Sequence, residues 1–438
     1  MAEKDEVLLK VENLCQFFKM GRGELKAVNN VGFDIKKGEV FGLVGESGCG
    51  KTTTGRTIIK LYNATSGNVY FKGKRIVAGT RSYKNEIAEK RAALKAERKK
   101  LAAEKAEKVK LAQGKENSAE LIAECESAFN EHIARLSSET SAYIADRKAE
   151  IKRAEHDDKY CDKDYAAEQV RLVKEKYEPL IAAEPDTETK EKLNKEYKAE
   201  LNKAKKSRIV TQIQMIFQDP IASLDPRMTV RDIIAEGLII KGERDKEVID
   251  RKVYEMLELV GLVPEHASRY PHEFSGGQRQ RIGVARSIIM NPEMIIADEP
   301  VSALDVSIQA QVINLLNDLR DKFGLTILFI AHDLSVVKYF SDRIGVMYFG
   351  NLVELASSDE LFAHPLHPYT KSLLSAIPLP DPVYEKNRKR ITYNPLAEHD
   401  YSTDKPSMRE VSPGHFIFCN DSEEKKYKQL LENCGETT

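Results

Sequence analysis

The sequence predicts an α/β fold with a largely parallel sheet, on three observations. Short apolar runs such as Val40–Val44 and Met294–Asp298 alternate with helical segments, the pattern of parallel strands joined by crossover helices. A glycine-rich segment, Gly45-Glu46-Ser47-Gly48-Cys49-Gly50-Lys51-Thr52, directly follows the first of these runs. Between residues 79 and 207 the composition becomes that of long charged helices. We therefore expect an α/β domain interrupted by a helical, coiled-coil-like insertion.

The glycine-rich segment has the pattern G-x-x-x-x-G-K-T and predicts a phosphate-binding loop. Its glycines let backbone N–H groups curl around an anion, and the helix that Thr52-Thr53-Thr54 opens directs its N-terminus at the phosphates. Lys51 would then reach the β- and γ-phosphates, and the Thr52 hydroxyl would hold Mg²⁺. A turn that carries a lysine by chance is the alternative, but the preceding strand and following helix favour a nucleotide site.

Charge, cysteine spacing and the length of the apolar runs argue against a nucleic-acid-binding, a secreted or a membrane-spanning protein. A length of 438 residues suggests two or three domains, and the formal net charge of -1 gives no global field for nucleic acid. The six cysteines lack C-x-x-C spacing and no signal peptide opens the chain, which favours a reducing, cytoplasmic setting. The apolar runs are too short to cross a bilayer, so we expect any membrane association to go through a partner.

The segments around the phosphate loop read as a small β-rich layer. Residues 8–18 and 27–35 are predicted strands, 40–44 is the strand that feeds the loop, and 68–71 follows the loop helix.

The insertion is dominated by Ala, Lys and Glu, with Gly114 as its only interior glycine. Apolar residues recur at heptad spacing: Ile87, Leu94, Leu101, then Ile122, Cys125, Phe129, Leu136, then Val170, Val173, Tyr177, Leu180. We expect two or three long helices folded back on one another, with breaks near Gly114 and around 156–158. The alternative to a helical insertion is a disordered charged tract, which the apolar residues at heptad spacing disfavour. The insertion could serve as an interaction arm or as a solvated spacer, and both roles remain open. If the insertion is removed, we expect its two ends to rejoin as a short loop.

Helices alternating with buried strands resume after the insertion. Strands are predicted at 213–218, 294–298 and 325–331, a mostly helical region at 220–272, and helices up to 290 and at 307–323. Residues 383–438 read as polar and irregular apart from a helix at 422–433.

Polar residues at the ends of these strands predict phosphoryl chemistry. Asp298 ends an apolar strand, where its carboxylate can hold Mg²⁺ opposite Thr52, and Glu299 can take a proton from attacking water. Gln218 could coordinate Mg²⁺ or water, and His332 could hydrogen-bond the γ-phosphate, although single residues at strand ends are often caps. Ser275-Gly276-Gly277-Gln278 precedes a helix and forms a second anion cradle, which lacks a lysine. Cys49 lies in the first cradle, whose donors predict a lowered pKa of its thiol.

Together these segments resemble the ATP-binding-cassette (ABC) family of P-loop ATPases. The matching motifs, in family order, are Walker A (Gly45 to Thr52), the glutamine loop (Gln218), the signature (Phe274 to Gln278), Walker B (Ile295 to Asp298, then Glu299), the D-loop (Ser302 to Asp305) and the switch histidine (His332). The resemblance implies that two cassettes pair head to tail, so that Ser275 and Gly277 touch the nucleotide of the partner. Phe18 aligns with the aromatic residue that stacks on adenine, although it could equally be core, as we expect of Phe17.

The motifs and the family resemblance together give the candidate site residues. Candidate catalytic residues are Lys51, Gln218, Glu299 and His332, and candidate Mg²⁺ ligands are Thr52, Gln218 and Asp298. Candidate ATP-binding residues are Phe18, Gly45, Glu46, Ser47, Gly48, Cys49, Gly50, Lys51, Thr52, Thr53, Gln218, Ser275, Gly276, Gly277, Gln278, Asp298, Asp305 and His332.

A closer resemblance is to the ATPase subunits of dipeptide/oligopeptide importers. It rests on residues 214–230, 271–287 and 304–315, on His364-Pro365-Leu366-His367-Pro368-Tyr369-Thr370, and on Pro378-Leu379-Pro380-Asp381-Pro382. Residues 411–419 resemble the tail of the second, F-type, ATPase subunit. Cys419 lacks the neighbouring cysteines that hold an iron–sulfur cluster in some relatives, so we expect no cluster, and the insertion has no counterpart in the family pattern.

The resemblance implies an organisation and a set of partners. The chain would comprise a first ATPase part at 1–78, the insertion at 79–207, a second ATPase part at 208–362 and a C-terminal extension at 363–438. Its partners would be a second ABC ATPase subunit, as a heterodimer or a homodimer, two transmembrane permease subunits and, indirectly, an extracytoplasmic peptide-binding protein, with no nucleic acid. It would lie peripherally on the cytoplasmic face of the cell membrane.

Two other classes carry similar motifs. DNA-repair or chromosome-organising ATPases also bear coiled coils, but theirs emerge after the glutamine loop, whereas this insertion precedes Gln218. Soluble translation factors of the superfamily carry two cassettes in one chain, and here one phosphate loop is present.

Overall fold

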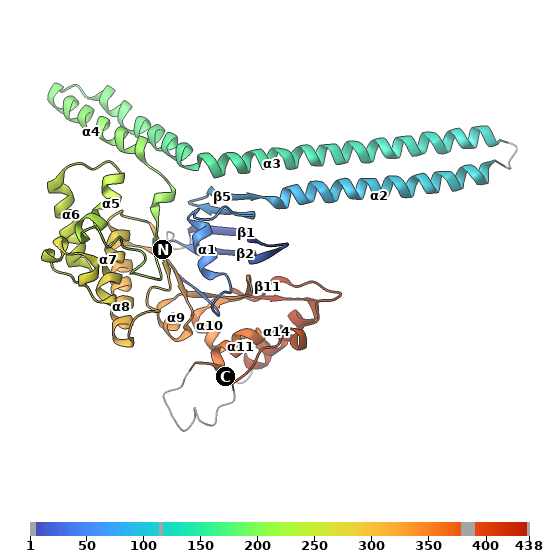
Figure 1. Ribbon diagram of the computed structural model, residues 1–438. Coiled ribbons are helices and arrows are strands. Elements are labelled where there is room, and N and C mark those ends of the chain that lie inside the picture. Colours follow the sequence, from blue (N-terminus) through green and yellow to red (C-terminus); the bar gives the residue numbers. More distant parts are fainter. Residues whose placement is uncertain (1–5, 114–116, 378–389, 436–438) are drawn as a thin grey trace.

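Two sheets, a helical region and a long helical arm make up the chain (Figure 1). The structure, a computed structural model, describes residues 6–113, 117–377 and 390–435. Among them, no helix combines the length and apolar character needed to cross a bilayer.

The larger sheet has eight strands in the order β11-β12-β10-β9-β3-β8-β7-β6. Its strands are β3 (Val40–Val44), β6 (Ile213–Ile216), β7 (Met294–Asp298), β8 (Thr326–Ala331), β9 (Arg343–Tyr348), β10 (Asn351–Ser357), β11 (Ser407–Ser412) and β12 (His415–Cys419). The neighbouring pairs β9–β3, β3–β8, β8–β7 and β7–β6 are parallel. The pairs β9–β10, β10–β12 and β12–β11 are antiparallel. Every residue of β3, β7 and β8 is buried, as expected of parallel strands covered on both faces. The predicted α/β fold is confirmed.

The smaller sheet has four antiparallel strands in the order β2-β1-β4-β5. These strands are β1 (Val7–Met20), β2 (Gly23–Lys36), β4 (Ser66–Phe71) and β5 (Lys74–Thr80). Apolar side chains from this sheet share one core with β3 and with helix α1 (Lys51–Ile58), which follows the phosphate loop. The phosphate loop therefore leaves β3 between the two sheets.

The remaining helices of the ATPase region lie around the larger sheet. They are α5 (Val230–Ile240), α6 (Lys246–Leu259), α7 (Gly276–Ile288), α8 (Val306–Phe323), α9 (Leu334–Phe340) and α10 (Ser358–Ala363). Two further helices, α11 (Pro368–Ser375) and α13 (Pro395–Glu398), belong to the C-terminal extension. Short 3-10 helices occur at Val210–Gln212, Pro264–Ser268 and Pro271–Glu273. Figure 1 shows α5, α6, α7 and α8 gathered at one side of the molecule, and their buried residues belong to the same core as the larger sheet.

The insertion forms an arm of α2 (Arg81–Ala112), α3 (Ser118–Ala183) and α4 (Thr187–Lys206). The reversal between α2 and α3 agrees with the prediction, although Gly114 itself lies outside the described residues. The second predicted break, at 156–158, is wrong because α3 runs through it and the chain turns only at 184–186. These charged residues are contact points instead: Asp157 Oδ2 lies 2.6 Å from Arg75 Nη2, and Asp158 Oδ1 lies 3.2 Å from Lys60 Nζ.

The middle of α3 is part of the ATPase core. Tyr165 is buried in the cluster that the smaller sheet forms, and its hydroxyl accepts a hydrogen bond from Gln212 Nε2 at 2.8 Å. Asp162 Oδ1 accepts the Val210 N–H at 3.2 Å. The arm is thus docked beside the strand that leads to Gln218, whereas most of the heptad seam of α2 and α3 is only half-buried and Leu180 is 50% exposed.

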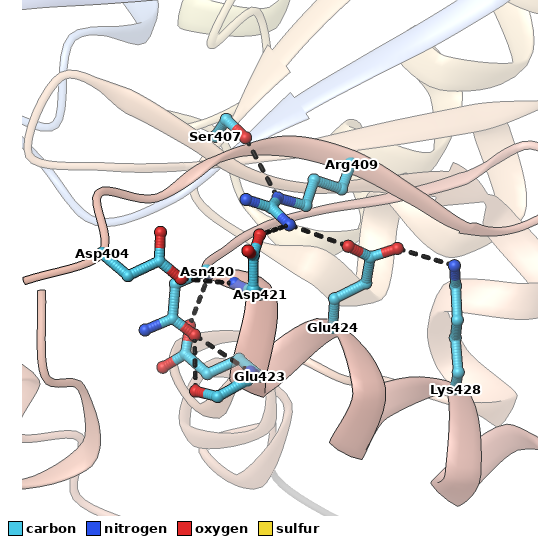
Figure 2. A network of polar contacts seen from close by, with 9 residues as sticks. Asp404, Ser407, Arg409, Asn420, Asp421, Glu423, Glu424 and Lys428 are labelled. Atoms are coloured by element: carbon cyan, nitrogen blue, oxygen red, sulfur yellow. Dashed lines mark hydrogen bonds and ion pairs between the residues drawn. The ribbon is translucent and has the colours of Figure 1, made fainter.

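The tail corrects a second prediction. The polar sequence of residues 407–419 predicts irregular structure, but β11 and β12 form a hairpin that pairs with β10 and extends the larger sheet. The predicted final helix is present as α14 (Asp421–Gly435). Figure 2 shows Arg409 of β11 bridging Asp421 and Glu424 of α14, with Glu424 also bound to Lys428. The segment Pro378-Leu379-Pro380-Asp381-Pro382 lies outside the described residues.

Candidate nucleotide site

The phosphate loop needs glycine at two close approaches. Gly45 has φ of +147°, and a Cβ on it would lie 2.2 Å from the Met347 carbonyl oxygen. Gly50 has φ of +107°, and a Cβ on it would lie 2.1 Å from the Ala27 carbonyl oxygen. Both approaches press the loop against backbone that cannot give way, so any side chain there would distort the anion cradle.

Lys51 begins α1 and turns back over the loop. Its side chain is 3% exposed, and Nζ donates to the Gly45 carbonyl at 2.7 Å and to the Glu46 carbonyl at 3.0 Å. The same Nζ lies 4.0 Å from Glu299 Oε1. The ammonium is therefore fixed where a phosphate in the cradle would meet it.

Thr52 and Asp298 meet at the carboxyl end of β7. The Thr52 hydroxyl donates to Asp298 Oδ1 at 2.7 Å, while the fully buried Oδ2 has no hydrogen-bond partner in the described chain and lies 3.9 Å from Arg56 Nη2. Burial raises the pKa of Asp298. A buried carboxylate oxygen that accepts no hydrogen bond, beside a hydroxyl, is a suitable donor set for Mg²⁺, so these residues fit the predicted ion.

Glu299 is at the centre of the converging side chains. Gln218 Nε2 donates to Glu299 Oε2 at 2.8 Å, and His332 Nδ1 lies 3.5 Å from the same oxygen. Glu299 has φ of +44°, a conformation that non-glycine residues rarely adopt, and its N–H donates to the Ile330 carbonyl at 2.9 Å. Backbone strain of this kind is typical of functional sites, and here it falls on the residue on which the other side chains converge.

The structure thus gathers one group of predicted residues. Lys51, Thr52, Gln218, Asp298, Glu299 and His332 lie at the carboxyl ends of β3, β6, β7 and β8.

The signature residues form a second, separate group. Ser275 caps α7: its Oγ accepts the Gln278 N–H at 3.4 Å, and Gln278 Oε1 accepts the Ser275 N–H at 3.0 Å. A Cβ on Gly277 would lie 2.5 Å from Ile308 Cγ2 of α8, so this glycine allows the close contact of the two helices. Asp305 precedes α8 and is exposed, and its side chain makes no capping hydrogen bond. Ser275 and Gly276 are exposed as well.

The aromatic candidate lies near the end of β1, beyond the part of this strand that pairs with β4. Phe18 is half-buried and packs edge-on against Tyr62, with ring centroids 5.3 Å apart. Phe17, expected in the core, is only half-buried, with Lys26 and Arg81 against its ring.

Cys49 corrects another prediction. Its thiol is buried, and burial raises its pKa, although Lys51 Nζ lies 3.8 Å from the sulfur and acts in the opposite direction. The donors of the cradle do not outweigh the loss of water around the sulfur.

Two residues near the site were not predicted. Arg56 lies one turn into α1, beside Asp298. Tyr369 of α11 accepts the Glu46 N–H with its hydroxyl at 3.0 Å. Arg56 follows Thr52 at helical spacing, and this spacing is a sequence signal that could have identified it. For Tyr369, the only such signal is the importer-like segment in which it lies.

Comparison with known proteins decides the family. The sequence pattern of the ABC transporter family matches residues 28–164 and 179–302, more than half of the chain. The chain belongs to this family. The pattern described as "Oligopeptide/dipeptide transporter, C-terminal region" matches residues 353–406.

Close relatives carry names of one kind. The chain is 45% identical to the oligopeptide transport ATP-binding protein OppF of Bacillus subtilis, over 96% of this chain and 99% of that protein. It is 40% identical to the dipeptide transport ATP-binding protein DppF of Lactococcus lactis, over 98% and 99%. A solved dimer of the cassette MJ0796 bound to ADP and Pi is 21% identical, with a TM-score of 0.47, over 80% of this chain and 99% of that one.

Proposed function

We propose that this ABC ATPase drives an importer of dipeptides or oligopeptides, hydrolysing ATP within a pair of cassettes docked on membrane permease subunits. The proposal of ATP hydrolysis rests on one observation. Lys51, Gln218 and His332 converge on Glu299, beside the Thr52–Asp298 pair. The peptide cargo rests on the names of the relatives and on the matched C-terminal pattern.

The proposed roles follow from the contacts. Lys51 neutralises the β- and γ-phosphates, and Thr52 with Asp298 holds Mg²⁺, which would balance the charge on those phosphates when bound. Glu299 accepts the proton of the attacking water, and Gln218 and His332 orient its carboxylate through the Oε2 that both face.

The exposed group supports a partner cassette. Ser275, Gly276 and Asp305 present hydroxyl, amide and carboxylate groups to solvent rather than to their own phosphate loop. We propose that they complete the nucleotide site of a second ABC subunit, that two permease subunits anchor the pair at the cytoplasmic face of the membrane, and that an extracytoplasmic binding protein delivers the peptide. Phe18 would stack on adenine.

We propose the same division of the chain that the sequence predicts. The ATPase comprises 1–78 and 208–362, separated by the insertion at 79–207 and followed by the extension at 363–438. The docking of α3 through Tyr165 favours an arm carried rigidly by the ATPase over a loose spacer.

The test is a pull-down in mild detergent from the native membrane, with mass spectrometry of the co-purifying chains. We expect a second cassette and two permeases. A chain that purifies without permeases and binds DNA in a salt-sensitive manner would instead belong with the DNA-organising ATPases.

A further inference from the structure

Two backbone groups of the phosphate loop make hydrogen bonds to segments that are distant along the sequence. At one end, the Gly350 N–H donates to the Cys49 carbonyl at 2.9 Å. At the other, the Glu46 N–H donates to the Tyr369 hydroxyl at 3.0 Å. The first contact is between backbone groups, but the second comes from a side chain of the C-terminal extension, more than three hundred residues away along the sequence.

Tyr369 is placed to hold this contact firmly. Its side chain is 2% exposed, and its ring packs against Tyr348 at 4.4 Å and Tyr393 at 5.7 Å between centroids. The Tyr369 hydroxyl is neutral at physiological pH, and burial raises its pKa further above the ordinary value. A neutral hydroxyl in a fixed ring is a constant acceptor for the Glu46 amide.

The segment that carries Tyr369 is itself anchored in the larger sheet. Glu354 of β10 is fully buried and accepts the Leu366 N–H at 2.7 Å and the His367 N–H at 3.1 Å. Its Oε1 also lies 2.9 Å from Nε2 of His415 in β12. His367 Nδ1 in turn accepts the Tyr369 N–H at 3.1 Å. Contacts therefore run without a gap from the C-terminal hairpin to the phosphate loop.

We infer that Tyr369 is a positioning residue for ATP, setting the phosphate loop in its binding shape through the Glu46 amide. This inference rests on the nucleotide site proposed above. Anion cradles work because their N–H groups are oriented before the ligand arrives, so freeing the Glu46 end of the loop lowers affinity for ATP. The Tyr369 hydroxyl touches neither substrate nor water in this role and acts only through the loop.

The test compares Tyr369→Phe with Tyr393→Phe in the full-length chain, titrated with ATP by calorimetry. Both changes remove one hydroxyl from the same aromatic cluster, but the Tyr393 hydroxyl makes no hydrogen bond to the loop among the described residues. We expect Tyr369→Phe to weaken ATP binding about threefold to tenfold, the worth of one hydrogen bond, and Tyr393→Phe to change it less than twofold. In the assembled transporter, Tyr369→Phe should raise KM for ATP and leave kcat at saturating ATP unchanged.

Hydrogen exchange gives a readout that a merely structural role would not move. The Glu46 amide should exchange faster in Tyr369→Phe than in the wild type, at equal melting temperature. Unchanged affinity and unchanged exchange would overturn the inference.

A third variant, Lys51→Ala, separates this inference from the proposed function. If Lys51→Ala abolishes ATP binding while Tyr369→Phe binds like the wild type, the nucleotide site stands and the role of Tyr369 falls. If Lys51→Ala binds ATP like the wild type, both fall.

Discussion

The two groups of site residues differ in how completely one chain satisfies them. Around the phosphate loop, Lys51 and Asp298 are buried, Lys51 donates to carbonyl groups of the loop itself, and Asp298 pairs with Thr52 and Arg56 of α1. Around the signature, Ser275 and Asp305 are exposed, and Ser275 bonds only within the first turn of its own helix among the described residues. We propose that the phosphate-loop group is a finished half-site, complete within one chain, and that the signature group meets a nucleotide held by another molecule.

The largest effect is expected at the centre of the finished half-site. Glu299→Gln keeps the shape of the side chain and its contact with Gln218 but cannot accept a proton, so turnover should fall by about 10²- to 10⁴-fold. ATP binding should persist, measured by calorimetry beside a phosphate-release assay. The matched control is Glu293→Gln, on the surface beside Lys72, which should retain activity. Near-normal turnover in Glu299→Gln would remove Glu299 from its proposed role.

Asp298→Asn should reduce turnover about tenfold to a hundredfold and raise the Mg²⁺ concentration needed for half-maximal rate, since it removes a ligand charge. The same change should stabilise the chain without metal. Burial raises the pKa of Asp298, so the native state holds that proton more tightly than the unfolded chain does. This contribution to stability is complete in acid and is lost as pH rises through the native pKa, so the gain in melting temperature should grow with pH. A wild-type Mg²⁺ dependence would exclude Asp298 as a ligand.

Ser275→Ala tests the exposed group. In the isolated chain it should leave ATP affinity unchanged, because Ser275 lies outside the finished half-site, while in the assembled transporter turnover should fall about tenfold. Ser268→Ala, another exposed serine in the same region, is the control. Weaker ATP binding by the isolated Ser275→Ala chain would break the distinction between the two groups.

The smallest effect concerns Cys49. Burial raises its pKa, so the thiolate fraction is low at neutral pH and iodoacetamide should label Cys49 several-fold more slowly than the half-exposed Cys125 of α3. The rate should rise with pH above neutrality. Mass spectrometry of the labelled peptides measures both, and equal rates at neutral pH would mean that the loop opens.

Local patterns predicted the sheet and the phosphate loop because their signals lie within the segments themselves. The apolar runs of β3, β7 and β8 are buried on both faces, and the glycine spacing of 45–50 follows from close backbone approaches.

The predictions that are wrong concern features that depend on contacts between distant segments. The sequence around Asp157 and Asp158 predicts a helix break, but these residues pair with Arg75 and Lys60 instead. The hairpin β11–β12 has little alternation of its own and forms against the edge of β10. The pKa of Cys49 is set by burial, which the letters of the loop do not reveal.

We propose that ATP binds between the phosphate loop of one cassette and the signature of another. The most direct measurement is a structure of the assembled complex, purified from the native membrane with Glu299→Gln and held with ATP. We expect the Ser275 hydroxyl within hydrogen-bond distance, about 3 Å, of the γ-phosphate on the facing phosphate loop. A Ser275 remote from every bound triphosphate in the closed assembly would contradict it.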